Sequence, residues 1–137
     1  MMKRKKILIV DDNESLLETF QSILEAKGYL IETVLNGREA LSKAKVTPFD
    51  LIILDIVLPD IKGDKISIEL KRSYKNLNII FVTGYPSFQD CINALDIGVY
   101  EILLKPIDPE ELLRSAEDSL KKTLENHHME DLVQVIE

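Results

Sequence analysis

The sequence predicts an α/β domain, a doubly wound sheet of five parallel strands with helices on both faces. Five short apolar runs alternate along the chain with segments whose apolar residues recur at helical spacing. Several of the runs have no polar alternation, which is typical of strands covered on both faces. Right-handed crossovers between successive strands place the helices on both sides, and the common strand order for this count is 2-1-3-4-5.

The five predicted strands are short and rich in branched apolar residues. They are expected at residues 7–10, 30–35, 51–54, 78–82 and 100–104. The run at 30–35 is partly alternating, which favours a position near an edge of the sheet.

The predicted helices follow the strands and end at ordinary stop signals. They are expected from Asn13 or Glu14 to the stop at Gly28, over 38–45 and 64–74, from Pro86 to Gly98, and from Asp108 onward. Asp108, followed by proline, is a typical helix start with a capping carboxylate.

Apolar spacing predicts the inward side of three of these helices. The expected core stripes are Leu16, Phe20, Ile23 and Leu24 in the first helix, Phe88, Cys91, Ile92 and Leu95 in the fourth, and Leu113, Ala116, Leu120 and Leu124 in the fifth. Cys91 is therefore interpreted as a small core residue rather than a reactive thiol.

The length and composition are those of a single domain that can bury a core without disulfides. The 137 residues carry a net charge of -7, which disfavours direct binding to nucleic acid, although Lys3 to Lys6 form a basic run interpreted as a solvated overhang. A single cysteine excludes an internal disulfide and fits a reducing compartment. Neither a signal peptide nor a membrane-spanning run is visible, so we expect a cytoplasmic chain without membrane contact.

Polar residues follow four of the predicted strands at the same edge of the sheet. They are Asp11 and Asp12 after the first, Asp55 after the third, Thr83 after the fourth and Lys105 after the fifth. Open α/β sheets bind their ligands at the carboxyl ends of the strands, beside the point where strand order reverses. A lone polar residue at a strand end is usually a helix cap, but five at one edge indicate a functional site.

The chemistry of this cluster favours a magnesium ion and a phosphoryl group. Three neighbouring carboxylates repel one another unless a cation lies between them. Oxygen ligands with room for water suit Mg²⁺. Asp55 beside Mg²⁺ can attack phosphorus to form an acyl phosphate, and Lys105 and Thr83 can stabilise the transferred charge.

These residues resemble the motif of one family. The resemblance is carried by Asp11-Asp12, Asp55 followed by Pro59 and Gly63, Thr83-Gly84 and Lys105-Pro106. The pattern is similar to the receiver domain of two-component response regulators, a flavodoxin-like fold, over roughly residues 5–124. We therefore expect a receiver domain at 5–125 and a helical extension or linker at 126–137.

The resemblance implies a role for each site residue. Asp55 would accept the phosphoryl group from a histidine kinase or phosphotransfer protein. Asp12, Asp55 and the Val57 carbonyl would bind Mg²⁺ directly, and Asp11 through water. Lys105 and Thr83 would contact the phosphoryl oxygens, and the Lys105–Pro106 bond is often cis in the family.

The resemblance also implies a switch rather than a turnover enzyme. Such a domain catalyses only its own phosphorylation and dephosphorylation. Phosphorylation changes the surface of the fourth helix, fifth strand and fifth helix, which serves an output partner or a homodimer. One departure affects the readout: the family's switch aromatic is Ile102 here, and Tyr100 is expected on the same face of the strand, two residues earlier.

Two other functions fit the sequence less well. A phosphatase of the haloacid dehalogenase type also uses an aspartyl phosphate, but it requires a second acid at the position of Val57. A receiver that works as an interaction module without phosphorylation would not need the intact set of acids.

Overall fold

A computed structural model describes residues 3–121 of the chain. Its five strands are β1 (Lys6–Val10), β2 (Leu30–Val34), β3 (Leu51–Asp55), β4 (Asn78–Thr83) and β5 (Glu101–Leu104). All neighbouring pairs are parallel, and the strand order is β2-β1-β3-β4-β5. The predicted architecture and strand order are confirmed, and β2 lies at an edge as expected.

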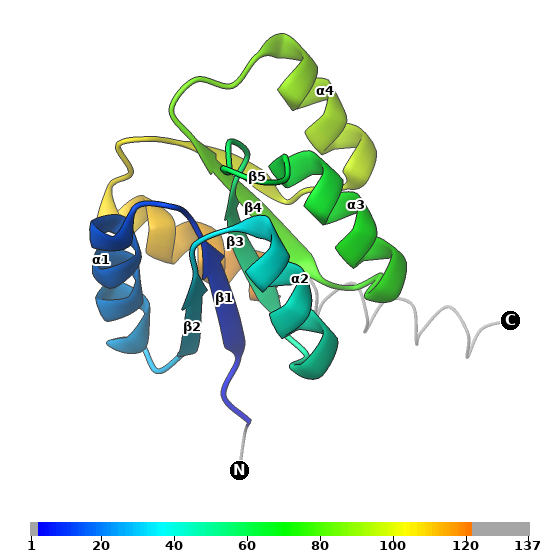
Figure 1. Ribbon diagram of the computed structural model, residues 1–137. Helices are drawn as coiled ribbons and strands as arrows, with labels where there is room; N and C mark the ends of the chain where they lie inside the picture. Colours follow the sequence, from blue (N-terminus) through cyan, green and yellow to red (C-terminus); the bar gives the residue numbers. More distant parts are fainter. Residues whose placement is uncertain (1–2, 122–137) are drawn as a thin grey trace, which may run out of the picture.

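The helices cover both faces of this sheet. They are α1 (Glu14–Glu25), α2 (Gly37–Val46), α3 (Gly63–Ser73) and α4 (Phe88–Ile97), and residues 109–121 are also helical. In Figure 1 α2, α3 and α4 lie on one side of the sheet, and α1 and the helix at 109–121 (yellow to orange) lie on the other. None of the helices within residues 3–121 has the length and apolar composition needed to cross a membrane.

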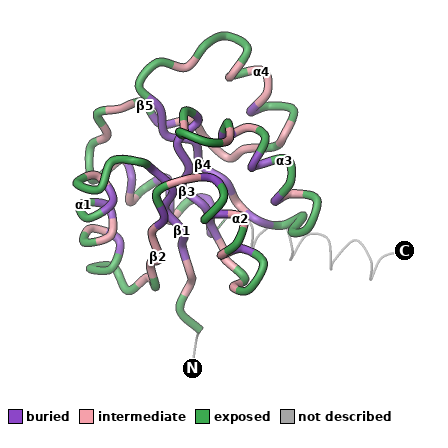
Figure 2. The backbone as a smooth tube through the Cα atoms, in the orientation of Figure 1, coloured by how far each residue is buried: buried purple, intermediate pink, exposed green. Residues whose placement is uncertain are grey.

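Two apolar cores, one on each face, account for the uninterrupted apolar runs. Successive side chains of a strand point to opposite faces. In β1, Leu8 and Val10 therefore pack in the core under α2 and α3, and Ile7 and Ile9 pack in the core under α1. Because both sets are buried (Figure 2), polar residues in the central strands are confined to the strand ends.

Side-chain caps define where several helices begin. Asn13 and Asn36 accept hydrogen bonds from the main-chain N–H groups of Leu16 and Glu39 at the starts of α1 and α2. Ser87 and Asp90 form a reciprocal capping box, so α4 begins at Phe88 rather than at Pro86. These caps fix the helix starts that follow the carboxyl ends of the strands.

The predicted inward stripe of α4 is wrong. Phe88 and Leu95 are 83% and 81% exposed, and Cys91 is exposed as well. The buried residue of α4 is Ala94, with Ile97 partly buried beside it. The side of α4 that packs on the fold carries Ala94 together with the polar residues that contact the start of α3.

Two polar contacts hold α4 against the start of α3. Lys62 Nζ lies 3.4 Å from Asp90 Oδ1, and Asn93 Nδ2 donates to Asp64 Oδ2 at 3.1 Å. Ala94 lies on the same side of the helix and is small enough to allow close packing. The exposed course of α4 can be followed in Figure 2.

Two smaller details of the predicted stripes also differ. In α1 Leu17 is fully buried, whereas Leu16 only packs against the edge of the core. In the helix at 109–121 Leu112 is fully buried and Leu113 is partly buried. Leu124 and the expected extension at 126–137 lie outside the described residues.

Paired substitutions distinguish the observed α4 orientation from the one that apolar spacing predicts. Leu112→Ala should lower the free energy of unfolding by about 2–5 kcal/mol, because Leu112 is 0% exposed. Leu95→Ala should change it by less than about 0.5 kcal/mol, because the Leu95 side chain lies in solvent. Urea denaturation measures both, and a loss at Leu95 as large as that at Leu112 would contradict this orientation.

Candidate functional site

The parallel sheet brings the predicted site residues together at one edge. Asp11 directly follows β1, Asp55 and Thr83 end β3 and β4, and Lys105 directly follows β5. Asp55 pairs in register with Val82, the residue before Thr83. Residues up to 94 positions apart in the sequence thereby reach hydrogen-bond distance.

Lys105 links two buried carboxylates. Its Nζ donates to Oδ2 of Asp11 at 2.8 Å and to Oδ2 of Asp55 at 2.9 Å. Asp11 is 2% exposed and Asp55 6% exposed, whereas Asp12 is exposed. The ammonium therefore joins the ends of β1 and β3 from the end of β5.

Main-chain N–H groups satisfy the other oxygen of each buried carboxylate. Asp55 Oδ1 accepts a hydrogen bond from the Val57 N–H, and Asp11 Oδ1 accepts one from the Asn13 N–H, both at 2.9 Å. Both carboxylates are thus held in fixed orientations by local backbone. Each contact closes a turn immediately after a strand.

Burial and charge shift the pKa values of this site in a consistent way. Burial raises the pKa of Asp55, a shift that the hydrogen bonds from Lys105 and Val57 oppose and that the nearby Asp11 charge reinforces. Burial alone would lower the pKa of Lys105, but its hydrogen bonds to Asp11 and Asp55 outweigh this and raise it. Lys105 therefore stays charged, and Asp55 loses its proton less readily than an ordinary aspartate.

The three carboxylates fit a divalent cation. One ligand oxygen from each of Asp11, Asp12 and Asp55 can be chosen so that all lie within 4.8 Å of one another. A single ammonium does not balance three acids, and oxygen-only donor sets suit Mg²⁺. Asp11, Asp12 and Asp55 are the residues that could hold the ion, and the Val57 backbone lies two residues after Asp55.

Close backbone packing shapes the loop after Asp55. The Gly63 N–H donates to the Ile56 carbonyl at 2.8 Å. A Cβ on Gly63 would lie 2.6 Å from the Asp55 carbonyl oxygen, so only glycine fits here. On the other side of the site the Lys105–Pro106 bond is cis, as the resemblance implied, and the Lys105 N–H donates to the Thr83 carbonyl at 2.9 Å.

The expectation for Tyr100 is wrong. Ile102 packs at the edge of the core under α2, α3 and α4, but Tyr100 packs on the opposite face, in the core with Leu103 and Leu112. Tyr100 precedes the first residue of β5, so strand alternation does not set the direction of its side chain. No aromatic side chain therefore takes the place of Ile102 on its own face of β5.

Residues 7–117 match the family model described as the response regulator receiver domain. The chain belongs to this family. The acidic residues Asp11, Asp12 and Asp55 form the pocket typical of the Mg²⁺ site in receivers, and such domains generally act as phospho-acceptor switches.

Relatives of this receiver include regulators and solved structures. The response regulator SaeR of Staphylococcus aureus strain USA300 is 32% identical over 122 residues, 89% of this chain and 53% of SaeR. The chain thus spans about half the length of the curated relatives it matches. A CheY-like receiver domain protein from Methanospirillum hungatei JF-1 is 31% identical with a TM-score of 0.88, over 90% of this chain and 99% of that one. Chemotaxis protein CheY4 of Vibrio cholerae is 32% identical with a TM-score of 0.81, over 85% and 99%.

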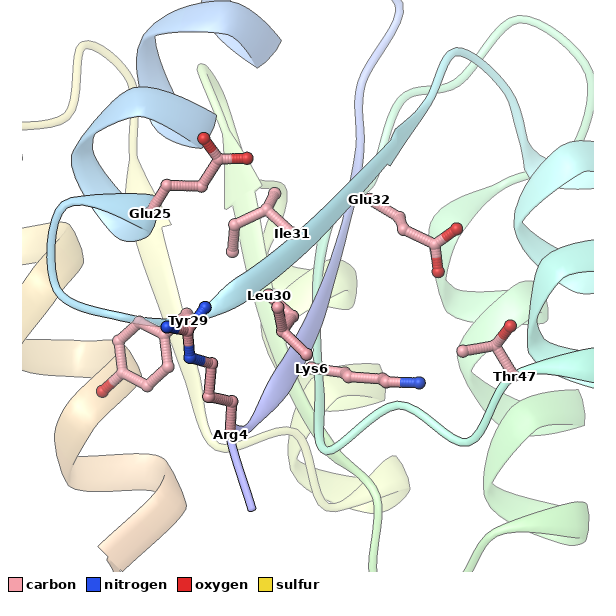
Figure 3. A pocket seen from close by; sticks show the side chains of 8 residues that line it. All are labelled: Arg4, Lys6, Glu25, Tyr29, Leu30, Ile31, Glu32 and Thr47. Atoms are coloured by element: carbon pink, nitrogen blue, oxygen red, sulfur yellow. The ribbon is translucent and has the colours of Figure 1, made fainter. Parts of the chain in front are cut away.

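The receiver also has a hollow far from these acids. It has a volume of about 650 Å³ and lies at the amino ends of β1 and β2 (Figure 3). Its lining carries both signs of charge, from Arg4 and Lys6 and from Glu25 and Glu32. None of the predicted site residues lines it, so it does not belong to the phospho-acceptor site.

Sequence reasoning missed one residue near the site. Asp60 lies in the loop after β3, and its carboxylate accepts hydrogen bonds from the N–H groups of Gly37 and Arg38. A Pro-Asp pair predicts only a turn, because the sequence does not indicate which distant helix the loop meets.

The raised pKa of Asp55 predicts a pH-dependent cost of ionisation. The folded chain holds the Asp55 proton more tightly than the unfolded chain, so this contribution to stability is complete below the ordinary aspartate pKa and is lost as pH rises through the raised value. Asp55→Asn should therefore resist urea better than the native chain at neutral pH in a buffer with EDTA. The difference should shrink as the pH falls to about 3.5.

The matched control is Asp12→Asn, which removes an exposed carboxylate of the same cluster. At neutral pH, Asp12→Asn should increase the resistance to urea less than Asp55→Asn does. A gain at Asp55→Asn that is equal at both pH values would show that packing, not ionisation, causes it.

Proposed function

We propose that this receiver is a signalling switch that accepts a phosphoryl group on Asp55 from a histidine kinase or phosphotransfer protein. A carboxylate oxygen of Asp55 forms a bond to phosphorus as the bond to the donor atom breaks, which leaves an acyl phosphate on the protein. The observation that carries this proposal is the ion pair of Lys105 with the buried Asp55 and Asp11.

The other site residues divide the remaining tasks. Asp12, Asp55 and the Val57 carbonyl would hold Mg²⁺ directly and Asp11 through water. When bound, the ion supplies positive charge for the phosphoryl oxygens. Lys105 would exchange its contact with Asp55 for one with the phosphoryl group, and the buried Thr83 hydroxyl would donate to another phosphoryl oxygen.

The single cysteine fits a reducing location, and we place the reaction in the cytoplasm. Recovery of the chain outside the cytoplasmic fraction of its cell would contradict this placement.

Phosphate uptake tests the proposal directly. Incubation with acetyl phosphate and Mg²⁺ should add one phosphoryl group, seen by intact-mass analysis, and EDTA should prevent the addition. Asp55→Asn should abolish it, whereas Asp64→Asn, which changes a half-buried aspartate at the start of α3, should not. Uptake by Asp55→Asn at the native rate would show that another residue is the acceptor.

We further propose that α4, β5 and the helix at 109–121 form the output surface, used by a partner or by a second copy. Exposed apolar side chains on this side support the proposal. Phe88 and Leu95 lie on α4, Leu104 lies on β5, and Tyr85 lies in the loop that connects Thr83 to α4. A rearrangement at Thr83 can therefore reach this surface through one short loop.

Light scattering with and without beryllofluoride, a phosphate mimic, tests self-association. We expect the mimic to raise the mean mass toward that of a dimer, and Leu95→Lys to prevent the increase. Val46→Lys is a matched control, because Val46 on α2 is 80% exposed and lies on another surface. A mass unchanged by the mimic at high concentration would exclude the homodimer and leave only the partner.

A further inference from the structure

One side chain ties the loop after β3 to the start of α2. Asp60 Oδ1 accepts a hydrogen bond from the Gly37 N–H at 2.8 Å, and Asp60 Oδ2 accepts one from the Arg38 N–H at 2.9 Å. Oδ1 also accepts from the N–H of Ile61 at 2.8 Å, within the loop itself. The carboxylate thus joins two segments that lie 22 and 23 residues apart in the sequence.

The loop and α3 pack closely against Gly37. A Cβ there would lie 2.5 Å from Ile66 Cδ1, 3.1 Å from Ile61 Cβ and 3.2 Å from Asp60 Oδ1. The loop and the first turn of α3 therefore pack directly on the backbone of α2. A side chain at position 37 would require the end of Ile66 to rotate away and the loop to give by a few tenths of an ångström.

Charge reinforces this attachment. Burial alone would raise the pKa of Asp60, but the hydrogen bonds from the N–H groups of Gly37, Arg38 and Ile61 together outweigh this and lower it. The carboxylate is therefore ionised at the positive end of the α2 dipole.

Helix capping alone does not explain Asp60, because α2 has its own cap. Asn36 Oδ1 accepts the Glu39 N–H at 2.9 Å and satisfies that part of the first turn. Asp60 adds bonds to two further N–H groups from a different segment of the chain. What Asp60 does beyond capping α2 is therefore to attach its own loop to that helix.

That loop begins at the candidate metal site. Val57 donates its N–H to Asp55 Oδ1, and Gly63 closes the far end of the loop by donating to the Ile56 carbonyl. Between these points Asp60 is attached to α2. The loop is therefore fixed to the sheet at both ends and to a helix in the middle.

We propose that Asp60 is a positioning residue for the phospho-acceptor site. By anchoring the loop on α2 it holds the Val57 backbone beside Asp55, in the place where the Val57 carbonyl can serve Mg²⁺. This inference rests on the proposed function and adds a residue that touches neither the ion nor the phosphoryl group. Loss of such outer contacts typically weakens metal affinity or activity about 10- to 100-fold.

The test compares two substitutions at the same helix end. Asp60→Ala releases the loop and removes contacts to α2, whereas Asn36→Ala removes only the cap of α2. Both should lower the free energy of unfolding. Only Asp60→Ala should weaken Mg²⁺ binding, by about 10-fold in a calorimetric titration, and slow phosphate uptake from acetyl phosphate.

A readout at the loop itself separates positioning from general destabilisation. Hydrogen exchange of the Val57 N–H should speed up in Asp60→Ala and stay at the native rate in Asn36→Ala. Asp60→Asn keeps one acceptor oxygen, so its Mg²⁺ affinity should lie between those of Asp60→Ala and the native chain.

The outcomes separate this inference from the proposed function. If the native chain binds Mg²⁺ and takes up phosphate, and Asp60→Ala matches Asn36→Ala in Mg²⁺ affinity, the positioning role is overturned and the proposed function stands. A native chain that neither binds Mg²⁺ nor takes up phosphate would overturn both.

Discussion

The ion pairs of Lys105 with Asp11 and Asp55 are the interaction on which the site depends. Asp11 and Asp55 are 2% and 6% exposed, and buried carboxylates of this kind require a compensating charge. Lys105 supplies one positive charge for both, and the exposed Asp12 leaves the cluster negative overall. The chain thus keeps an anionic site that attracts a cation while the fold tolerates the buried acids.

The sheet explains why this cluster lies where it does. With β1, β3 and β4 covered on both faces, the strand interiors accept only apolar residues, and polar groups are confined to the ends. This pattern is visible in the sequence, where every central apolar run is followed by an aspartate or a threonine. Strand order and the location of the acids were therefore predictable from pattern alone.

Features set by contacts between distant segments were not predictable in this way. In α4 the apolar stripe of Phe88, Cys91 and Leu95 has correct helical spacing but faces solvent. The side that carries Asp90, Asn93 and Ala94 packs on the fold instead, and its contacts with the start of α3 join distant segments. The predicted direction of the Tyr100 side chain was wrong for a local reason. Tyr100 precedes β5, so strand alternation does not apply to it. Asp60 required knowledge of which helix its loop meets, which single-sequence periodicity does not contain.

The few contacts of α4 determine how much free energy is needed to detach this helix from the rest of the fold. Ala94 is its one fully buried residue, and the Lys62–Asp90 pair that anchors it is spaced at 3.4 Å with the lysine largely in solvent. An exposed ion pair of this kind contributes at most about 1 kcal/mol and weakens as salt screens it. Detaching α4 therefore requires far less free energy than unfolding the sheet, which places this helix at the low end of the molecule's hierarchy of local openings. Within the proposed switch, a phosphorylated Asp55 would therefore need to supply only a few kcal/mol to move α4 while the two cores beneath it stay intact.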